Sequence, residues 1–377
     1  MSTNKELYVT RPYLPQREQF DKYLDEIWDS YQLTNHGPLH NRLQADLSKM
    51  FDGNCVTLVA NGHLGLDVAL HVMDVAGEVI TTPFSFASTT HALTWIGLSP
   101  VFCDVKDSDL TIDPDKIEAL ITERTTAILP VHVYGHLCDM ERIDEIARKH
   151  GLKVIYDAAH AFGVRLDGKS IAAFGDVSMF SFHATKLFHT VDGGALVYTN
   201  TDIQRKFDVG TNFGIWDYAY DYIGTNAKMN EFQAAMGLCV LPHLKTLIEE
   251  RKLINKRYID NLSAVNGIKI MSHVDTPRVE HNFAYMPILV DEESFRHTAD
   301  DMLIILQKQQ INCRRYFHPL ISDYACYKGR FSDVPTPVAR RVADQILCLP
   351  IFNGMRLQDV DRVCEAILDC KSSYEWV

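Results

Sequence analysis

The sequence predicts an α/β protein in which a seven-stranded, mostly parallel sheet is followed by a smaller C-terminal α+β domain. Short apolar segments alternate with segments of helical spacing through the first half of the chain. These segments are almost continuously apolar, which is typical of parallel strands covered by helices on both faces. The chain has 377 residues, 46% of them hydrophobic and 23% charged, which is sufficient for two packed domains.

The N-terminal residues are expected to form an extended arm and two amphipathic helices. Thr10–Pro15 carries two prolines and precedes the first helical pattern. The apolar residues that recur at helical spacing are Phe20, Tyr23, Leu24, Ile27 and Trp28, then Leu43, Leu47, Met50 and Phe51.

Seven strands are expected between residues 56 and 199, and the pattern leaves the direction of each strand open. The predicted strands cover 56–61, 78–86, 100–105, 125–134, 152–157, 177–181 and 195–199. A helix begins at Gly62, directly after the first strand, and another covers 114–121.

A long helical pattern from Phe232 to Leu262, interrupted near Pro242, is expected to connect the two domains. We place the N-terminal arm and the large domain at residues 1–245 and the small domain at 246–377. In the small domain the pattern predicts strands at 283–290 and 311–317 and helices at 300–309 and 358–370.

The composition excludes several classes of function. The formal net charge of −12 is opposite to the basic surface that nucleic acid requires. No segment approaches the roughly 18 to 20 apolar residues of a membrane helix and no leader pattern is seen, so a soluble cytoplasmic protein is expected. The nine cysteines form no C-x-x-C pair, which indicates reduced thiols.

His132 and His136 are candidate metal ligands four residues apart. This spacing brings two side chains together on a helix, whereas these histidines flank a strand end, so we expect no metal site.

The chemistry is expected to centre on Lys186. This lysine follows the strand that ends at Ser181, and Asp157 ends the strand before it. Ligands of open α/β sheets bind beyond the carboxyl ends of the strands, so the amine and the carboxylate should face one site. Pyridoxal phosphate needs such a pair, because the lysine forms a Schiff base with its aldehyde and the aspartate keeps its pyridine nitrogen protonated.

Four segments resemble, in the same order, the DegT/DnrJ/EryC1/StrS family of nucleotide-sugar aminotransferases. They are Asp157–His160, Ser181–Lys186, Asp192–Gly194 and Gly224–Gly237. The resemblance extends over nearly the whole chain. It implies the fold-type I architecture of pyridoxal enzymes and transfer of an amino group from L-glutamate to a nucleotide-linked keto sugar, with Lys186 and Asp157 as the catalytic residues.

The resemblance also implies how the cofactor is held. His160 would lie near its phenolic oxygen, Phe86 would stack on its ring and Ser181 would bind its phosphate. Asn226 would reach the cofactor phosphate of a neighbouring subunit in trans, so the enzyme would be a homodimer. The cofactor-binding residues expected in this way are Lys186, Asp157, His160, Ser181, Phe86, Gly62, His63 and Asn226.

The nucleotide sugar is expected near residues 313–320, which resemble the family segment beside the substrate. Two neighbouring arginines there carry the positive charge that a diphosphate requires. The expected substrate-binding residues are Arg314, Arg315, Tyr316, His318, Lys228 and His183.

Three segments, Ala60–Leu64, Phe86–His91 and Gly224–Lys228, are most similar to those of transaminases that make dTDP-4-amino-4,6-dideoxyglucose. This implies dTDP-4-dehydro-6-deoxy-D-glucose as substrate and a role in surface polysaccharide or O-antigen biosynthesis. Amination at C3 of a 3-keto sugar and use of a UDP- or GDP-linked sugar are the alternatives. A pyridoxal-dependent sugar dehydratase, which would carry histidine in place of Lys186, and a noncatalytic regulatory protein on the same scaffold are further alternatives.

Overall fold

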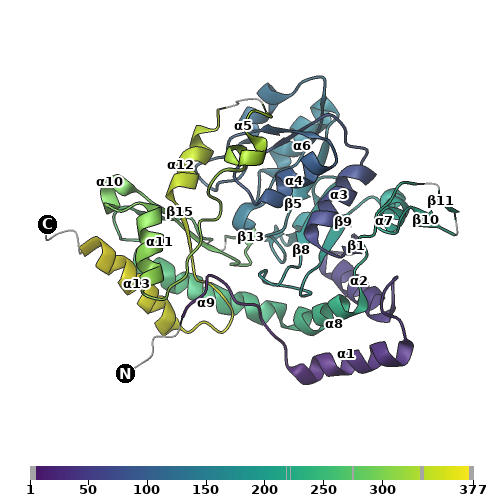
Figure 1. The fold of residues 1–377 in the computed structure, drawn as a ribbon, viewed down its shortest axis with the longest axis horizontal. Helices are drawn as coiled ribbons and strands as arrows, with labels where there is room; N and C mark the ends of the chain where they lie inside the picture. The colour runs from purple at the N-terminus through teal and green to yellow at the C-terminus, as the bar shows by residue number, and fades with distance from the viewer. Residues whose placement is uncertain (1–5, 218, 221, 274–275, 332–334, 373–377) are drawn as a thin grey trace.

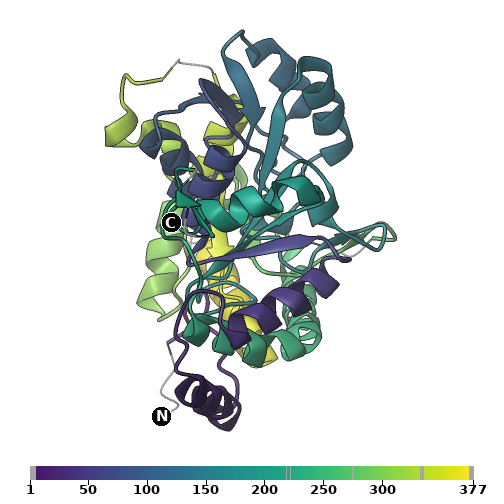
Figure 2. The ribbon, with the colours of Figure 1, turned by 90° about the vertical axis from the view of Figure 1, so that its right-hand side faces the viewer.

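The computed structural model of the protein describes residues 6–217, 219–220, 222–273, 276–331 and 335–372. In Figure 1 the large sheet and its helices occupy the right side, and the green to yellow C-terminal elements lie on the left. Figure 2 shows the same arrangement turned by 90°, with the N-terminal helix α1 (Arg17–Ser30) at the periphery of the molecule. Within the described residues, no helix is both long and apolar enough to cross a membrane.

The large sheet contains the seven strands that the sequence predicts, in the order β1-β9-β8-β5-β4-β2-β3. Strand β9 runs antiparallel to both of its neighbours, and the other pairings are parallel. The predicted α/β class is therefore confirmed. The strands are β1 (Cys55–Val59), β2 (Glu78–Thr81), β3 (Ser99–Phe102), β4 (Thr125–Ile128), β5 (Lys153–Asp157), β8 (Val177–Ser181) and β9 (Gly194–Tyr198).

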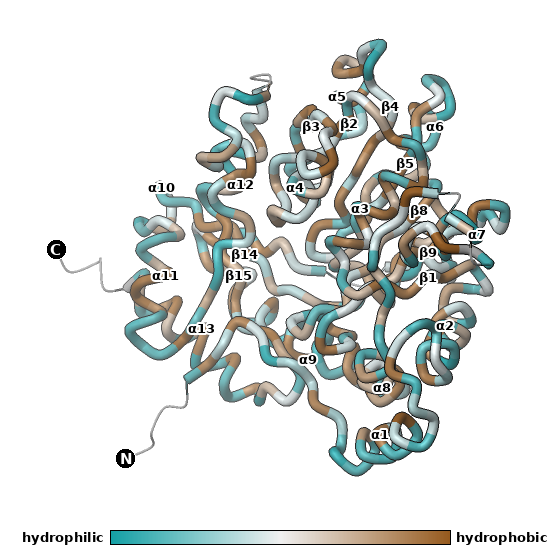
Figure 3. The backbone as a smooth tube through the Cα atoms, turned by 45° about the vertical axis from the view of Figure 1, so that its right-hand side comes forward, coloured by the Kyte–Doolittle hydropathy of each residue, from teal (hydrophilic) through white to brown (hydrophobic). Residues whose placement is uncertain are grey.

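Helices cover both faces of this sheet. Within strand β5 the side chains alternate, because Val154 and Tyr156 belong to one hydrophobic core and Ile155 belongs to the other. The first core includes side chains from helices α2 (Pro38–Met50), α6 (Met140–His150) and α8 (Glu231–Val240). The second core includes side chains from helices α3 (Gly62–Val72), α4 (Ala87–Trp95) and α7 (Gln204–Gly210). The hydropathy colouring of Figure 3 follows this pattern, with brown segments along the strands and teal segments on the outer turns.

The predicted helical connection is present and breaks where expected. Helix α8 ends at Val240, a short 3₁₀ turn holds Pro242, and α9 (Leu244–Leu262) continues. Proline lacks an N–H and cannot continue an α-helix ladder, which explains the break.

The C-terminal elements surround a three-stranded antiparallel sheet, β12-β14-β15, with its own hydrophobic core. The predicted strand at 311–317 is wrong, because Ile311 and Arg314 form only isolated bridges, to Leu7 and Cys348. The elements are β12 (Ile268–Ile270), β14 (Met286–Val290), α10 (Glu292–Phe295), α11 (Ala299–Lys308), α12 (Pro337–Gln345), β15 (Ile346–Leu349) and α13 (Leu357–Ser372). The remaining short elements are α5 (Pro114–Ile117), the sheet of β6 (Arg165–Leu166), β7 (Lys169–Ser170) and β13 (Val279–Glu280), and the pair β10 (Ile215–Trp216) and β11 (Ala219–Tyr220).

The N-terminal arm connects the two parts of the chain. Leu7 is buried in the C-terminal core, and its backbone bonds to Gln310 and Asn312 at 2.9 and 2.8 Å. Further along the arm, the carbonyl oxygen of Tyr13 lies 2.6 Å from Nε2 of His189, in the segment that follows Lys186. The division of the chain at residues 245 and 246 remains a prediction.

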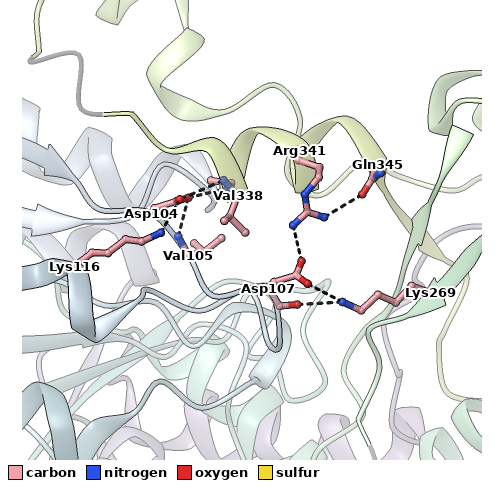
Figure 4. A network of polar contacts seen from close by, with 9 residues as sticks. Asp104, Val105, Asp107, Lys116, Lys269, Val338, Arg341 and Gln345 are labelled. Atoms are coloured by element: carbon pink, nitrogen blue, oxygen red, sulfur yellow. Dashed lines mark hydrogen bonds and ion pairs between the residues drawn. The ribbon is translucent and has the colours of Figure 1, made fainter. Parts of the chain in front are cut away.

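Carboxylates also join the two parts, as Figure 4 shows. The buried side chain of Asp104, which follows β3, accepts hydrogen bonds from the amides of Val338 and Ala339 at 3.2 and 2.8 Å. These amides lie in the first turn of α12 and have no partner within the helix. Nearby, Asp107 pairs with Arg341 at 2.6 Å and with Lys269 at 3.2 Å. The edge of the large sheet is thereby fixed to the C-terminal part.

The same arrangement occurs at the start of α2. This helix also begins with proline, and Glu231 accepts from the amides of Leu39 at 2.8 Å and His40 at 2.9 Å. An added Cβ at Gly37 would lie 2.5 Å from Cδ of Glu231, so only glycine leaves room for this carboxylate. A negative charge at a helix N-terminus is also favoured by the helix dipole.

Replacement of Glu231 by alanine is expected to lower the free energy of unfolding by about 1–3 kcal/mol, because it leaves two buried amide donors without an acceptor. Urea denaturation of the variant would measure this loss. Glu123→Ala, which removes an exposed turn carboxylate, is the control and should stay within about 0.5 kcal/mol of the parent. Equal stability of the two variants would contradict a capping role for Glu231.

Candidate active site

A cavity of about 340 Å³ opens where β5 and β8 end. It has two sides, because some lining residues follow strands of the large sheet and others come from the C-terminal part. Nine of the predicted site residues line it: Gly62, His63, Phe86, Asp157, His160, Ser181, His183, Lys186 and Tyr316.

Asp157 is the last residue of β5 and is 5% exposed. Its Oδ2 accepts a hydrogen bond from Oγ1 of Thr89 at 2.8 Å, and its Oδ1 accepts from the amide of Ala159 at 3.2 Å. Burial raises the pKa of Asp157, while these two hydrogen bonds and the charge of Lys186 act in the opposite direction. The site therefore contains a buried carboxylate held in one orientation.

Lys186 lies in the turn that follows β8, where its amide donates to the carbonyl of His183 at 2.8 Å. Its Nζ donates to the hydroxyl of Tyr285 at 3.1 Å. Removal of the amine from water lowers the pKa of Lys186 to about 8, although the charge of Asp157 favours the protonated form. About a tenth of the amine is consequently neutral, and thus nucleophilic, at pH 7, far more than for an ordinary lysine.

The low pKa of Lys186 predicts the pH dependence of its reaction with an aldehyde. Only the neutral amine attacks, so the rate at which cofactor-free protein takes up pyridoxal phosphate should rise as the pH passes through about 8 and level off above it. Stopped-flow absorbance between pH 6 and pH 10 would measure this rate. A midpoint near the value of an ordinary lysine, about 10.4, would contradict the prediction.

His160 is buried beside the carboxylate strand, and its Nδ1 accepts from the amide of Tyr134 at 3.0 Å. Burial lowers the pKa of His160 well below its usual value, so the imidazole is neutral. Because Nδ1 accepts, Nε2 carries the proton. The ring therefore presents one N–H donor to a ligand.

The opposite end of the cavity is the N-terminus of α3. The side chain of Asn61 caps this helix by accepting from the amide of Leu64 at 2.9 Å. At Gly62 an added Cβ would lie 3.0 Å from Sδ of Met179 and 3.1 Å from Cβ of Ser181, so the helix start and the end of β8 approach closely. Helix N-termini bind phosphate through their free amides and their dipole.

Two further side chains complete this end of the site. Nδ1 of His63 lies 2.8 Å from Oγ of Ser88. Phe86 lines the cavity and yet is 60% exposed, with its ring centroid 6.4 Å from that of Phe317. An exposed flat ring on the wall of a cavity is suited to stacking on a planar ligand.

The residues present fit pyridoxal phosphate. The amine of Lys186, the carboxylate of Asp157, the Phe86 ring and the α3 N-terminus supply a group for the aldehyde, the ring nitrogen, the ring face and the phosphate respectively. They surround one cavity in the crevice where open α/β sheets bind their ligands.

The two arginines predicted to bind the diphosphate, and the predicted substrate-binding residue His318, do not line this cavity. The side chain of Arg315 is 7% exposed, and its guanidinium donates to the carbonyls of Ala343, Asp344 and Ile346 at the end of α12 and pairs with Asp300. It is therefore used by the fold. Arg314 and His318 are exposed beside it.

Asn226 and Lys228 also lie outside the cavity, in the segment that pairs with the end of β1. Nζ of Lys228 donates to Oδ1 of Asn212 at 2.7 Å and of Asn226 at 3.1 Å, and lies 4.9 Å from the ring centroid of Phe213. Asn226 is exposed to solvent and does not face the cavity of its own subunit.

Three important residues were not predicted. Thr89 fixes Asp157, while Tyr285 and Phe317 form the wall from the C-terminal part. The only sequence signal was for Tyr285, a hydroxyl within the apolar segment 283–290. Nothing local in the sequence connects that segment with Lys186.

This fold and this site together define a pyridoxal-phosphate-dependent transferase of fold-type I. The sequence profile of the DegT/DnrJ/EryC1/StrS aminotransferase family matches residues 15–368, and the chain belongs to this family. It is therefore a sugar aminotransferase that uses pyridoxal phosphate.

Two curated relatives are both named dTDP-4-amino-4,6-dideoxy-D-glucose transaminase. The chain is 42% identical to the one from Shigella dysenteriae, with 97% of this chain and 100% of the relative covered. It is 39% identical to the one from Escherichia coli, with 97% and 99% covered. A crystal structure of DesI in the presence of its TDP-sugar product superposes with a TM-score of 0.94 at 32% identity and covers 99% of this chain and 95% of that chain.

Proposed function

We propose that this enzyme transfers the amino group of L-glutamate to C4 of dTDP-4-dehydro-6-deoxy-D-glucose, forming dTDP-4-amino-4,6-dideoxy-D-glucose. The observation that carries the substrate is the full-length similarity to two transaminases of that name. We place the reaction in the cytoplasm, where the product would supply surface polysaccharide or O-antigen synthesis.

Lys186 is proposed to bind the cofactor and then to move protons. When bound, pyridoxal phosphate carries the amino group from donor to acceptor and takes up electrons into its ring. Nζ of Lys186 removes a proton from the α-carbon of glutamate and delivers one to C4 of the sugar as the amine forms there. Its pKa of about 8 suits both steps near neutral pH, because acid and base forms are both accessible.

The other cavity residues are proposed to hold the cofactor in place. The carboxylate of Asp157 keeps a proton on the ring nitrogen, and Nε2 of His160 donates to the phenolic oxygen. Ser181 and the amides of Gly62 and His63 bind the phosphate, as supported by the α3 N-terminus at that end of the cavity. Phe86 stacks on the ring, and His183 and Tyr316 contact the sugar.

A homodimer with Asn226 acting in trans is proposed for the assembly. Neither Asn226 nor Lys228 lines the cavity of its own subunit, which supports this proposal. Large apolar side chains are also exposed on α1 and in the segment after it, including Tyr31 at 90% exposure. Arg314 and His318, which are exposed as well, would then complete a substrate site only in the dimer.

Complementation between two inactive variants tests this arrangement. In a hybrid of Lys186→Ala and Asn226→Ala subunits, the intact Lys186 shares a site with the intact Asn226 only if the asparagine acts in trans. Tagged hybrids purified after co-expression should then recover up to about half of the parent activity per dimer. A hybrid no more active than either parent variant would contradict the trans arrangement.

The substrate is tested by following the visible absorbance of the bound cofactor. Glutamate should remove the band, and dTDP-4-dehydro-6-deoxy-D-glucose should restore it, with NMR of the product showing an amino group at C4. Restoration only by a 3-keto isomer, or only by a UDP- or GDP-linked sugar, would replace the proposed substrate by that one. Loss of a hydroxyl from the sugar would indicate a dehydratase, and absence of any band after addition of the cofactor would favour a regulatory protein.

A further inference from the structure

The hydroxyl of Tyr285 contacts the reactive amine. Nζ of Lys186 lies 3.1 Å from its hydroxyl oxygen, and both residues line the cavity. They come from different parts of the chain, because Lys186 follows β8 and Tyr285 directly precedes β14. The amine of one part therefore meets the phenol of the other only after the two parts have packed together.

The ring of Tyr285 is held by aromatic neighbours on several sides. Its centroid lies 4.6 Å from that of His160, 5.5 Å from that of Tyr134 and 6.2 Å from that of Tyr316. Rings at such distances pack in tilted or edge-to-face pairs, which limits rotation of the phenol away from the cavity.

The backbone before Tyr285 is fixed by buried polar side chains. Nη1 of the buried Arg251 donates to the carbonyl of Ala284 at 3.0 Å, and Nε of Arg251 donates to Oδ1 of Asn353 at 2.8 Å. The side-chain amide of Asn282 donates to the carbonyl of His160 at 2.8 Å. These hydrogen bonds connect the segment of Tyr285 to His160, which follows the end of β5 and is a predicted cofactor contact. The hydroxyl of Tyr285 therefore has a defined position.

A neutral phenol can serve both forms of the lysine. It accepts a hydrogen bond from an ammonium group and donates one to a neutral amine. Burial raises the pKa of Tyr285, so that the phenol stays protonated over the working range. Lys186 needs such a partner whenever its amine is not bound to the cofactor, because a freed lysine side chain has four rotatable bonds and many positions to occupy.

We propose that Tyr285 is a positioning residue whose hydroxyl holds the free amine of Lys186 in place for proton transfer. This inference rests on the role proposed above for Lys186. The phenol forms and breaks only hydrogen bonds, and the proton itself is carried by Nζ. Loss of the hydroxyl would let the amine leave the position from which it reaches the reacting carbon, so the rate should fall more than substrate binding.

Tyr285→Phe tests the proposal, with Tyr258→Phe as the matched control. Tyr258 is a buried tyrosine of the C-terminal core, and its hydroxyl donates to the carbonyl of Pro350 at 2.9 Å, away from the cavity. Each variant loses one hydrogen bond of a phenol and keeps the aromatic ring, so the two should have similar thermal stability. Any difference in activity between them then arises at the cavity.

Two measurements separate a positioning from a structural role. The first is the kcat for the sugar, which should fall about 10-fold or more in Tyr285→Phe with KM changed less than about threefold. The second uses cofactor-free protein, in which labelling of Lys186 by acetic anhydride is followed against pH by peptide mass spectrometry. The hydrogen bond that the phenol accepts from the charged ammonium is stronger than the one it donates to the neutral amine. The labelling pKa of Lys186 should therefore be lower in Tyr285→Phe than in the parent and unchanged in Tyr258→Phe.

A kcat within about twofold of the parent, or an unchanged labelling pKa of Lys186, would overturn the proposal. Borohydride reduction of the parent holoenzyme followed by peptide mapping distinguishes this failure from a failure of the proposed function. Cofactor found on Lys186 leaves the proposed function intact whatever the Tyr285 result, whereas cofactor found elsewhere would remove the basis of both.

Discussion

Lys186→Ala protein is expected to show no measurable transfer of an amino group to the sugar. Two losses would combine in this variant, because it lacks the amine that we propose both binds the cofactor and moves the proton. Proton transfer by a positioned group is alone worth about 10²- to 10⁴-fold in rate. Product formation measured with the sugar and glutamate at saturating concentrations would quantify the loss.

The control for this variant is Lys49→Ala, which removes an exposed lysine paired with Asp46 on α2. It should retain the parent rate. Addition of methylamine to Lys186→Ala protein is expected to restore part of the activity, since a small amine can enter the cavity and accept the proton. Activity of Lys186→Ala within about 10-fold of the parent, less than the smallest effect of a lost general base, would contradict the assignment of the lysine.

Asp157→Asn is expected to lower kcat by about 10²- to 10³-fold, the range found when one preorganised electrostatic contact is removed from an active site. Asparagine has the shape of aspartate, and its oxygen can still accept from the amide of Ala159 while its NH2 group donates to Oγ1 of Thr89. It carries no charge, however, to keep the cofactor's ring nitrogen protonated. The control is Asp176→Asn, which changes a carboxylate that accepts from the amide of Val154 at 2.8 Å outside the cavity.

The stability of Asp157→Asn should not fall with its activity. Burial raises the pKa of Asp157 in the folded protein, so the folded state binds a proton more tightly than the unfolded state does. The free energy of unfolding then decreases as the pH rises from the unfolded pKa through the folded pKa. In the cofactor-free protein at pH 7 the charged Asp157 is therefore a destabilising group, and cofactor-free Asp157→Asn should melt at the same temperature as the cofactor-free parent or higher. A lower melting temperature together with parent-like kcat would indicate a purely structural carboxylate.

Much of the large sheet could be predicted because its signals are local. Each strand is a short apolar segment, and the polar residues that follow β5 and β8 fall where ligands bind. Strand β2 ends earlier than predicted, before Pro83, and β4 ends before Pro130. Proline has no N–H to donate to the hydrogen-bond ladder of a sheet. The apolar pattern of the sequence continues through both prolines, so the pattern alone places the strand ends too late.

The C-terminal part was harder to predict because its contacts are distant in sequence. The segment at 311–317 has the composition of a strand, but its partners Leu7 and Cys348 provide only single bridges. Strands β12 and β15 have three and four residues, which is too short for a clear period. Arg315 has the residue type of an anion ligand, and only the position of the α12 carbonyls shows that its guanidinium is already engaged.

The N-terminal arm imposes an order on the folding of the newly made chain. Leu7 leaves the ribosome long before its partners at 310–312 are made. Closing so long a loop is slow. Until the loop closes, the arm is not held at Leu7, and the contact of Tyr13 with the segment after Lys186 lacks that support. The arm can therefore be fixed against the segment beside the cavity only after residues 310–312 have been made. Nascent chains arrested before residue 310 should consequently have an arm that proteases cut readily.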